Sequence, residues 1–97
     1  MTRILLGCNI SIMIDMLKAI AEENRLQIVR LLSKGSLCVC EIEAKLIIPQ
    51  NLVSHHLSVL KKAGLIEDCR CGKNKYYSLN KNTVNFLIKK LTKYGEE

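Results

Sequence analysis

The chain has 97 residues, of which 48% are hydrophobic, and we expect one domain spanning residues 1–97. A domain this small hides only about 60–70% of the surface of its unfolded chain, so we expect a homodimer to cover part of the rest. No segment approaches the roughly 20 apolar residues of a membrane span, and no arrangement of nucleophile and base supports an enzyme. These observations argue against a membrane protein and against catalysis.

The formal net charge is +6, and it is unevenly placed. Residues 49–97 contain nine Lys or Arg side chains against four Asp or Glu, whereas residues 1–48 are nearly balanced. A one-sided basic field is what a polyanionic partner requires. On charge alone, a solubilising surface explains the excess equally well.

Five cysteines are present, and four of them form two Cys-x-Cys pairs. An odd count and this close spacing fit a secreted disulfide scaffold poorly. We therefore expect reduced thiols and a cytoplasmic protein.

Apolar periodicity and stop signals predict five helices and two strands. The helices are expected over residues 10–21, 24–33 and 39–46, then from Pro49 to a stop at Gly64, and finally over 83–94. The strands are expected over residues 65–70 and 75–79, with a turn at 71–74 between them. The second helix is expected to bury Leu26, Ile28, Val29, Leu31 and Leu32. The first and last helices are expected to hold the dimer together through Met13, Leu17, Phe86 and Leu87.

The fourth helix combines an apolar stripe with a polar outer face. The stripe consists of Leu52, Val53, Leu57, Val59 and Leu60. Short polar side chains near the N-terminal half of a helix suit it to the DNA major groove, and a basic hairpin follows. The candidate DNA contacts are Gln50, Asn51, Ser54, His55, Ser58, Arg70, Lys73 and Lys75. A solvated helix face is the alternative for the polar residues, and the adjacent cations favour DNA.

Cys38 and Cys40 stand directly before this helix, at the predicted start of the third. Thiolates bind soft ions well, and a helix N-terminus is expected to lower the thiol pKa. Residues two apart on a regular helix diverge by about 200°, so both thiols can face one ion only where the backbone is partly unwound. An ion or oxidant acting here could control DNA affinity. Two buried structural cysteines are the alternative.

Two short helices, a helix with a polar outer face and a basic hairpin follow the order of a winged helix-turn-helix. More specific matches lie at residues 23–32, 37–42, 54–66 and 76–79. In order and spacing, over nearly the full length, they resemble the ArsR/SmtB family of metal-responsive repressors. The resemblance implies a mainly α fold with a two-stranded β-hairpin wing, a homodimer and operator DNA as partner. It also implies a structural role for His56 in helix packing.

The resemblance further implies a metal site at the third helix. One branch of the family senses arsenite or antimonite and adds a third cysteine three residues after the pair, where this chain has Glu43. Another branch senses cadmium, lead or zinc and takes further cysteines from the N-terminal segment of the other subunit, where this chain has Cys8. The expected site is therefore Cys38 and Cys40 of one subunit with Cys8 of the other. The expected effector is a thiophilic ion such as As(III), Cd, Pb or Zn.

Three other interpretations stay open. Thiol oxidation or persulfidation could replace the metal as the input to the same repressor. A small dithiol metal carrier is a different class of protein, but it would need neither the polar helix face nor the basic wing. Cys69 and Cys71 could join Cys38 and Cys40 in a four-thiolate zinc site. Their spacing is unusual for structural zinc, and we expect the wing to project away from the third helix.

Overall fold

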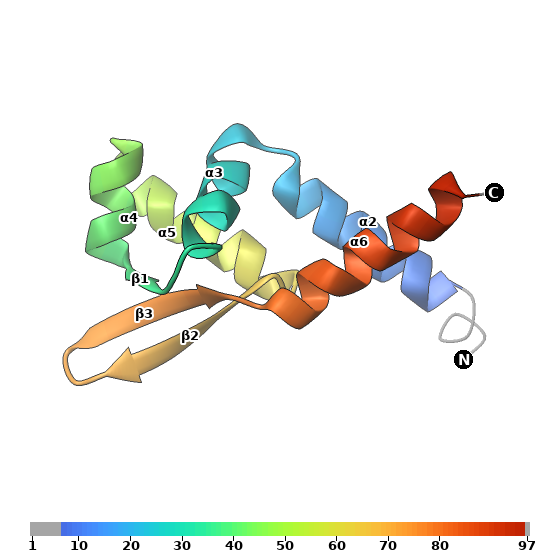
Figure 1. Ribbon diagram of the computed structural model, residues 1–97. Coiled ribbons are helices and arrows are strands. Elements are labelled where there is room, and N and C mark those ends of the chain that lie inside the picture. The colour runs from blue at the N-terminus through green and yellow to red at the C-terminus, as the bar shows by residue number, and fades with distance from the viewer. Residues whose placement is uncertain (1–6, 97) are drawn as a thin grey trace.

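The computed structural model describes the backbone of residues 7–96 and the side chains of residues 10–96 (Figure 1). In this part of the chain the helices are α2 (Gly7–Ile20), α3 (Glu23–Leu32), α4 (Val39–Leu46), α5 (Gln50–Lys62) and α6 (Lys81–Gly95). The strands are β1 (Leu37–Cys38), β2 (Ile66–Cys71) and β3 (Asn74–Leu79). In Figure 1, α3, α4 and α5 form a cluster, the β2–β3 hairpin extends beside it, and α2 lies next to α6 at the far end. None of the helices described is long and apolar enough to cross a bilayer.

The predicted elements are confirmed, with small shifts at their ends. Pro49 is the N-cap of α5 rather than its first helical residue. Gly64 has φ +79°, and the N–H of Leu65 donates to the Leu60 carbonyl at 3.1 Å. This arrangement is a Schellman motif, which ends α5 because the left-handed conformation suits glycine. Asn80 caps α6 by accepting a hydrogen bond from the N–H of Thr83 at 3.3 Å.

The sheet has three strands rather than the predicted two. The strand order is β1-β3-β2, and both pairings are antiparallel. The short β1 places Leu37 opposite Tyr77 and Cys38 opposite Tyr76. A two-residue strand has no alternation that a sequence pattern could reveal. Its consequence is large, because it attaches the middle of β3 to the start of α4.

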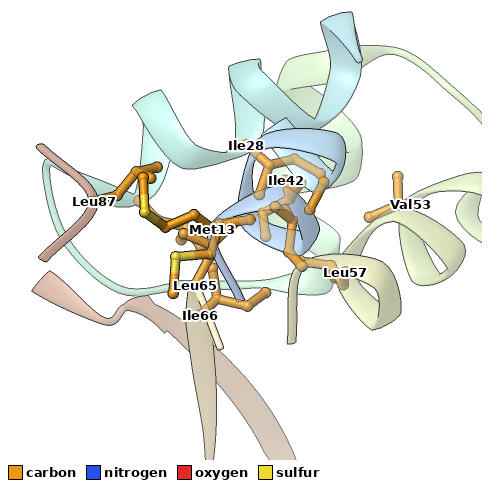
Figure 2. Close-up of a cluster of buried hydrophobic side chains, with 12 residues drawn as sticks. Met13, Ile28, Ile42, Val53, Leu57, Leu65, Ile66 and Leu87 are labelled. Carbon is orange, nitrogen blue, oxygen red and sulfur yellow. The ribbon is translucent and has the colours of Figure 1, made fainter. Parts of the chain in front are cut away.

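The core lies where α2, α3, α4, α5 and the base of the hairpin meet (Figure 2). Its most completely buried side chains are Ile28, Leu32, Ile42, Val53, Leu57, Leu60 and Leu65. Two residues assigned to buried stripes are exposed instead, since Leu26 is 53% and Leu52 43% accessible. Conversely, Met13 and Leu87 are each 5% accessible. They belong to the core of the single chain, so little of either side chain is left exposed for the predicted dimer contact.

A polar network around Arg25 joins α2, α3 and α5. The Arg25 Nε donates to the Ala19 carbonyl at 2.6 Å, and its guanidinium lies 3.2 Å from His56 Nδ1. Glu22 accepts the backbone N–H of Arg25 at 2.9 Å and thereby caps α3. Because arginine stays protonated and only donates, the facing Nδ1 of His56 must be the unprotonated acceptor. His56 is 7% accessible, so its predicted structural role is confirmed.

The His56 ring is held in its neutral form, which gives stability a definite pH dependence. Burial lowers its pKa, the Glu22 carboxylate opposes this effect, and the charges of Arg25 and His55 add to it. Below the ordinary histidine pKa of about 6.5, the unfolded chain therefore binds more protons than the native one. The free energy of unfolding should fall as the pH drops from about 6.5 towards 5. Glu22, whose pKa is lowered mainly by the N–H of Arg25, loses its contribution only at lower pH.

We predict that His56→Leu removes this acid-dependent slope, although it also leaves the Arg25 guanidinium without its partner. That loss should cost about 1–3 kcal/mol at neutral pH. Denaturant unfolding at several pH values between 5 and 7.5 measures both effects. The matched control is His55→Leu, because His55 is exposed, and it should keep the wild-type slope. A wild-type protein equally stable at pH 5 and 7.5 would contradict the conclusion that His56 is held neutral in the folded protein.

Candidate functional site

The outer face of α5 presents a row of short polar side chains to solvent. All five predicted base-reading residues are exposed, namely Gln50, Asn51, Ser54, His55 and Ser58. The opposite face is fixed by Val53, His56, Leu57 and Leu60, which are buried. α4 and α5 are joined by a short turn in which Ile47 has a left-handed backbone, with φ 57° and ψ 47°. The result is a helix-turn-helix whose second helix has a free polar face.

The wing adds cations beside this face, but they are not equivalent. Lys61 of α5 and Lys75 of β3 both contact the Asp68 carboxylate, at 3.0 and 3.3 Å. A hydrogen bond from Lys61 is the largest cause that lowers the pKa of Asp68, and Lys75 adds to it. Arg70 and Lys73 are exposed and, within the described part of the chain, take part in no ion pair. Their charges are therefore more available to a polyanion than that of Lys75.

Asp68, which the sequence reasoning did not single out, links the wing to α5. Its carboxylate ties the wing to α5, so it orients the hairpin relative to the polar helix face. The available signal was strand alternation, which places Asp68 on the same face of β2 as Arg70. An acidic residue on the same strand face as a cation, within a basic hairpin, could have been interpreted as a tether for one of its neighbours.

Cys38 and Cys40 lie at the junction between β1 and α4. Cys38 is the N-cap of α4, with an extended backbone at φ −85° and ψ 167°. Its N–H donates to Glu41 Oε1 at 3.0 Å, and its sulfur faces the Glu41 N–H in a capping box. Cys38 is buried, whereas Cys40 is exposed. The helical divergence of about 200° does not apply, because Cys38 precedes the helix.

The Cys38 thiol does not have the lowered pKa that its position at a helix start had suggested. A side-chain hydrogen bond with Cys40 is the largest cause that raises its pKa, ahead of a backbone hydrogen bond from Glu41 that lowers it. Burial and the Glu41 side chain raise it further. In the free protein the raised pKa favours the protonated form of the Cys38 thiol.

The structure does not bring a third ligand to this pair. Among the described residues, no three side chains of Cys, His, Asp or Glu cluster closely enough to hold a metal ion. Cys8 is in the backbone of α2, but its side chain lies outside the described residues. Glu43 occupies the position of a local third cysteine and is half-buried. Among the described side chains, a site at this pair within one chain therefore offers two thiols.

Cys69 and Cys71 are exposed free thiols on β2. The expectation that the wing projects away from the third helix does not hold along its whole length, because the middle of β3 pairs with β1 at the start of α4. Tyr76 pairs with Cys38 on one side and with Cys69 on the other, so one row across the sheet reads Cys38, Tyr76, Cys69. With about 4.8 Å between strands, the outer two backbones lie roughly 10 Å apart. Tyr76 stands between them, and a four-thiolate zinc site is not assembled.

An apolar surface remains uncovered where α2 meets α6. It surrounds a hollow of about 440 Å³ lined by Ile10, Met13, Ile14, Leu17, Leu91 and Tyr94. Apart from Met13, these side chains are between 41% and 56% accessible. The Tyr94 hydroxyl lies 3.8 Å from Met13 Sδ and links the two helices. Of the four predicted dimer contacts, only Leu17 belongs to this surface and is exposed.

Comparison with known proteins shows similarity to bacterial and archaeal transcriptional regulators. The family model described as "Bacterial regulatory protein, arsR family" matches residues 22–68. The uncharacterized HTH-type transcriptional regulator MJ1325 of Methanocaldococcus jannaschii is 40% identical over 77% of this chain and 85% of its own length. The arsenical resistance operon repressor of Escherichia coli is 43% identical over 69% of this chain, which spans 58% of that repressor.

A solved structure gives the same result for the fold. The homodimeric winged helix-turn-helix DNA-binding domain Mb0332 from Mycobacterium bovis, a possible ArsR-family regulator, superposes with a TM-score of 0.77. The match covers 93% of this chain and 84% of that one at 26% identity. The polar face of α5, the basic wing and these relationships agree, and the chain belongs to the ArsR family of DNA-binding transcriptional regulators.

Proposed function

We propose that the protein is a dimeric repressor that leaves its operator when a thiophilic ion binds Cys38 and Cys40. The main support for the proposal is the position of this thiol pair in the fold. Cys38 ends the strand that pairs with the wing and begins the helix that packs against α5. A ligand of the pair therefore acts on the element that joins both parts of the DNA-binding surface.

The donor set fits a soft ion. Sulfur ligands favour ions such as As(III), Cd, Pb or Zn over hard cations, and Cys40 is open to solvent while Cys38 is not. The name of the E. coli relative refers to arsenical resistance, which supports a metalloid or metal effector. Two thiolates leave such an ion short of ligands, and Cys8 of the partner subunit is the proposed third.

The coupling follows from what Cys38 does in the free protein. Its sulfur faces the Glu41 N–H, and its own N–H is held by the Glu41 carboxylate. Turning the Cys38 sulfur towards a shared ligand would compete with this capping box. The start of α4 would then shift relative to β3, and α5 with it, because α4 packs on α5. Allosteric coupling of this kind is typically worth 1–3 kcal/mol, or about 5–150-fold in affinity.

The dimer is proposed to form over the apolar surface between α2 and α6. The homodimeric Mycobacterium bovis domain supports it. Leu17→Glu, on this surface, should convert the protein to a monomer, because a carboxylate would be buried without a partner. Leu26→Glu is the matched control, since Leu26 is 53% accessible but lies on α3. Sedimentation equilibrium distinguishes the two species, and a wild-type monomer at micromolar concentration would refute the dimer.

DNA binding should divide into contacts that specify sequence and contacts that only attract phosphate. Ser54→Ala or His55→Ala should reduce the preference for the operator by about 1–3 kcal/mol per lost base contact. Lys73→Ala should weaken binding to every duplex and lower the salt slope by about one. Lys93→Ala serves as the control, because Lys93 is exposed near the end of α6.

Fluorescence anisotropy with pseudo-palindromic and random duplexes, over a range of salt concentrations, measures these effects. Half-sites should lie about 34 Å apart, or a multiple of it. Equal affinity for operator and random DNA at every salt concentration would rule out sequence-specific recognition.

Release by metal should depend on both thiols. Cys38→Ser and Cys40→Ser should each keep DNA binding and lose release, because serine remains a good N-cap but is a poor ligand for soft ions. Anisotropy titrations with As(III) and Cd under strictly anaerobic, reducing conditions measure release and exclude oxidation as the input. Cys69→Ser/Cys71→Ser is the control and should respond like wild type. If either Cys38→Ser or Cys40→Ser still dissociated from DNA at the ion concentration that releases the wild-type protein, the sensing site would lie elsewhere.

The same titrations test whether Cys8 acts across subunits. Cys8→Ser should bind the ion more weakly than wild type. A mixed dimer of Cys8→Ser with Cys38→Ser/Cys40→Ser chains should retain one site if ligation crosses the interface. Loss of both sites in the mixed dimer, or wild-type affinity in Cys8→Ser, would show that Cys8 is not the third ligand in trans.

A further inference from the structure

The wing carries a second thiol pair that DNA recognition does not use. Cys69 and Cys71 are two residues apart on β2, so their side chains leave the same face of the hairpin. Both are exposed and free. They stand opposite Tyr76 and Asn74 of β3, whereas Arg70 and Lys75 face each other on the other side. The Cys69 sulfur makes one long contact, to the Arg70 carbonyl at 3.9 Å, and both residues remain open to solvent.

The spacing of the strand limits what these thiols can bind together. Residues two apart on a strand are about 6.8 Å apart, at the upper end of the range that disulfides tolerate. A tetrahedral zinc site with bonds of about 2.3 Å needs sulfurs only about 3.8 Å apart. A linear site with bonds of the same length needs about 4.6 Å. Side chains that lean towards each other along the strand reach about 4–5 Å, which matches the linear site.

We propose that Cys69 and Cys71 form a second soft-ion site, separate from Cys38 and Cys40, that takes a monovalent two-coordinate cation such as Cu(I). Binding releases the proton of each thiol to solvent and forms two metal–sulfur bonds, with no change in oxidation state. Two thiolates and one monovalent cation leave a net charge of −1 at the occupied site. Linear coordination is complete with two sulfurs, so this site needs no ligand from a partner subunit.

The negative charge of the occupied site should weaken DNA binding, an effect that rests on the proposed function. Arg70 and Lys73 lie next to the thiol pair in sequence and are its nearest unpaired cations on the hairpin. A negative charge among them offsets one cation that would otherwise meet a DNA phosphate. Loss of one such contact corresponds to roughly a fivefold weaker affinity near 0.15 M salt. Occupation of the wing site should therefore weaken binding to operator and random DNA alike.

The first test asks only whether the site exists. A full-length variant with Cys8, Cys38 and Cys40 all replaced by serine keeps the wing pair as its only thiols. Anaerobic titration with Cu(I) against a competing chelator, followed by native mass spectrometry, should show one ion per chain. Both wing thiols should become protected from alkylation together. Replacing Cys71 by serine in the same background should abolish binding, and Cu(I) binding that persists there, or no binding in the parent variant, would overturn the site.

The second test asks whether the site acts on DNA. In the variant that keeps only the wing thiols, Cu(I) should weaken DNA binding roughly fivefold, and As(III) should not. Cu(I) binding without any change in DNA affinity would overturn the regulatory part of the proposal. This outcome is independent of release through Cys38 and Cys40, which is measured in chains that retain those residues and lack the wing thiols. A failure of the wing site can therefore be distinguished from a failure of the site at Cys38 and Cys40.

Discussion

The short ladder between β1 and β3 is the contact on which the functional architecture depends. It spans two residue pairs, yet it attaches the start of α4 to the strand that carries Lys75, Tyr76 and Tyr77. Without it, the hairpin would be tied to the helical cluster only through its own base and through the Asp68 ion pairs. Cys38 belongs to both the β1–β3 ladder and the capping box of α4. Any rearrangement of its sulfur would therefore affect β3 and α4 together. A sensing site placed in the middle of a helix would lack this connection.

A second constraint keeps α5 from moving independently of the rest of the core. Arg25 holds the last turn of α2 through the Ala19 carbonyl and holds α5 through His56. These contacts are polar and directional, whereas the surrounding contacts of the buried Leu57 and Leu60 are apolar and non-directional. α5 is thus anchored near its middle, while its N-terminus follows α4 after a turn of three residues. A displacement that begins at Cys38 would therefore tilt the polar end of α5 more than its C-terminal end.

Much of the fold could be predicted from the sequence, because most of its signals are local. Asn80, Pro49 and Gly64 mark helix ends by short-range chemistry, and the structure places all three at such ends. The errors concern properties that depend on distant partners. β1 exists only because β3 is beside it, Met13 is buried only because other elements cover it, and the pKa of Cys38 is set mainly by Cys40. A helix-start rule for thiol pKa considers the backbone alone and omits the neighbouring thiol.

The row Cys38, Tyr76, Cys69 explains why four thiols near one sheet do not merge into one site. A tetrahedral ion would need all four sulfurs within about 3.8 Å of one another, and the intervening strand keeps the two pairs too far apart for that. The pairs also differ in their surroundings, since Cys38 is buried at a helix start while Cys69 and Cys71 are exposed on an edge strand. If both pairs bind soft ions as proposed, backbone geometry would give them different coordination preferences. Cys38 lies before α4 and Cys40 within it, whereas the regular strand would hold Cys69 and Cys71 further apart, as a linear ion requires.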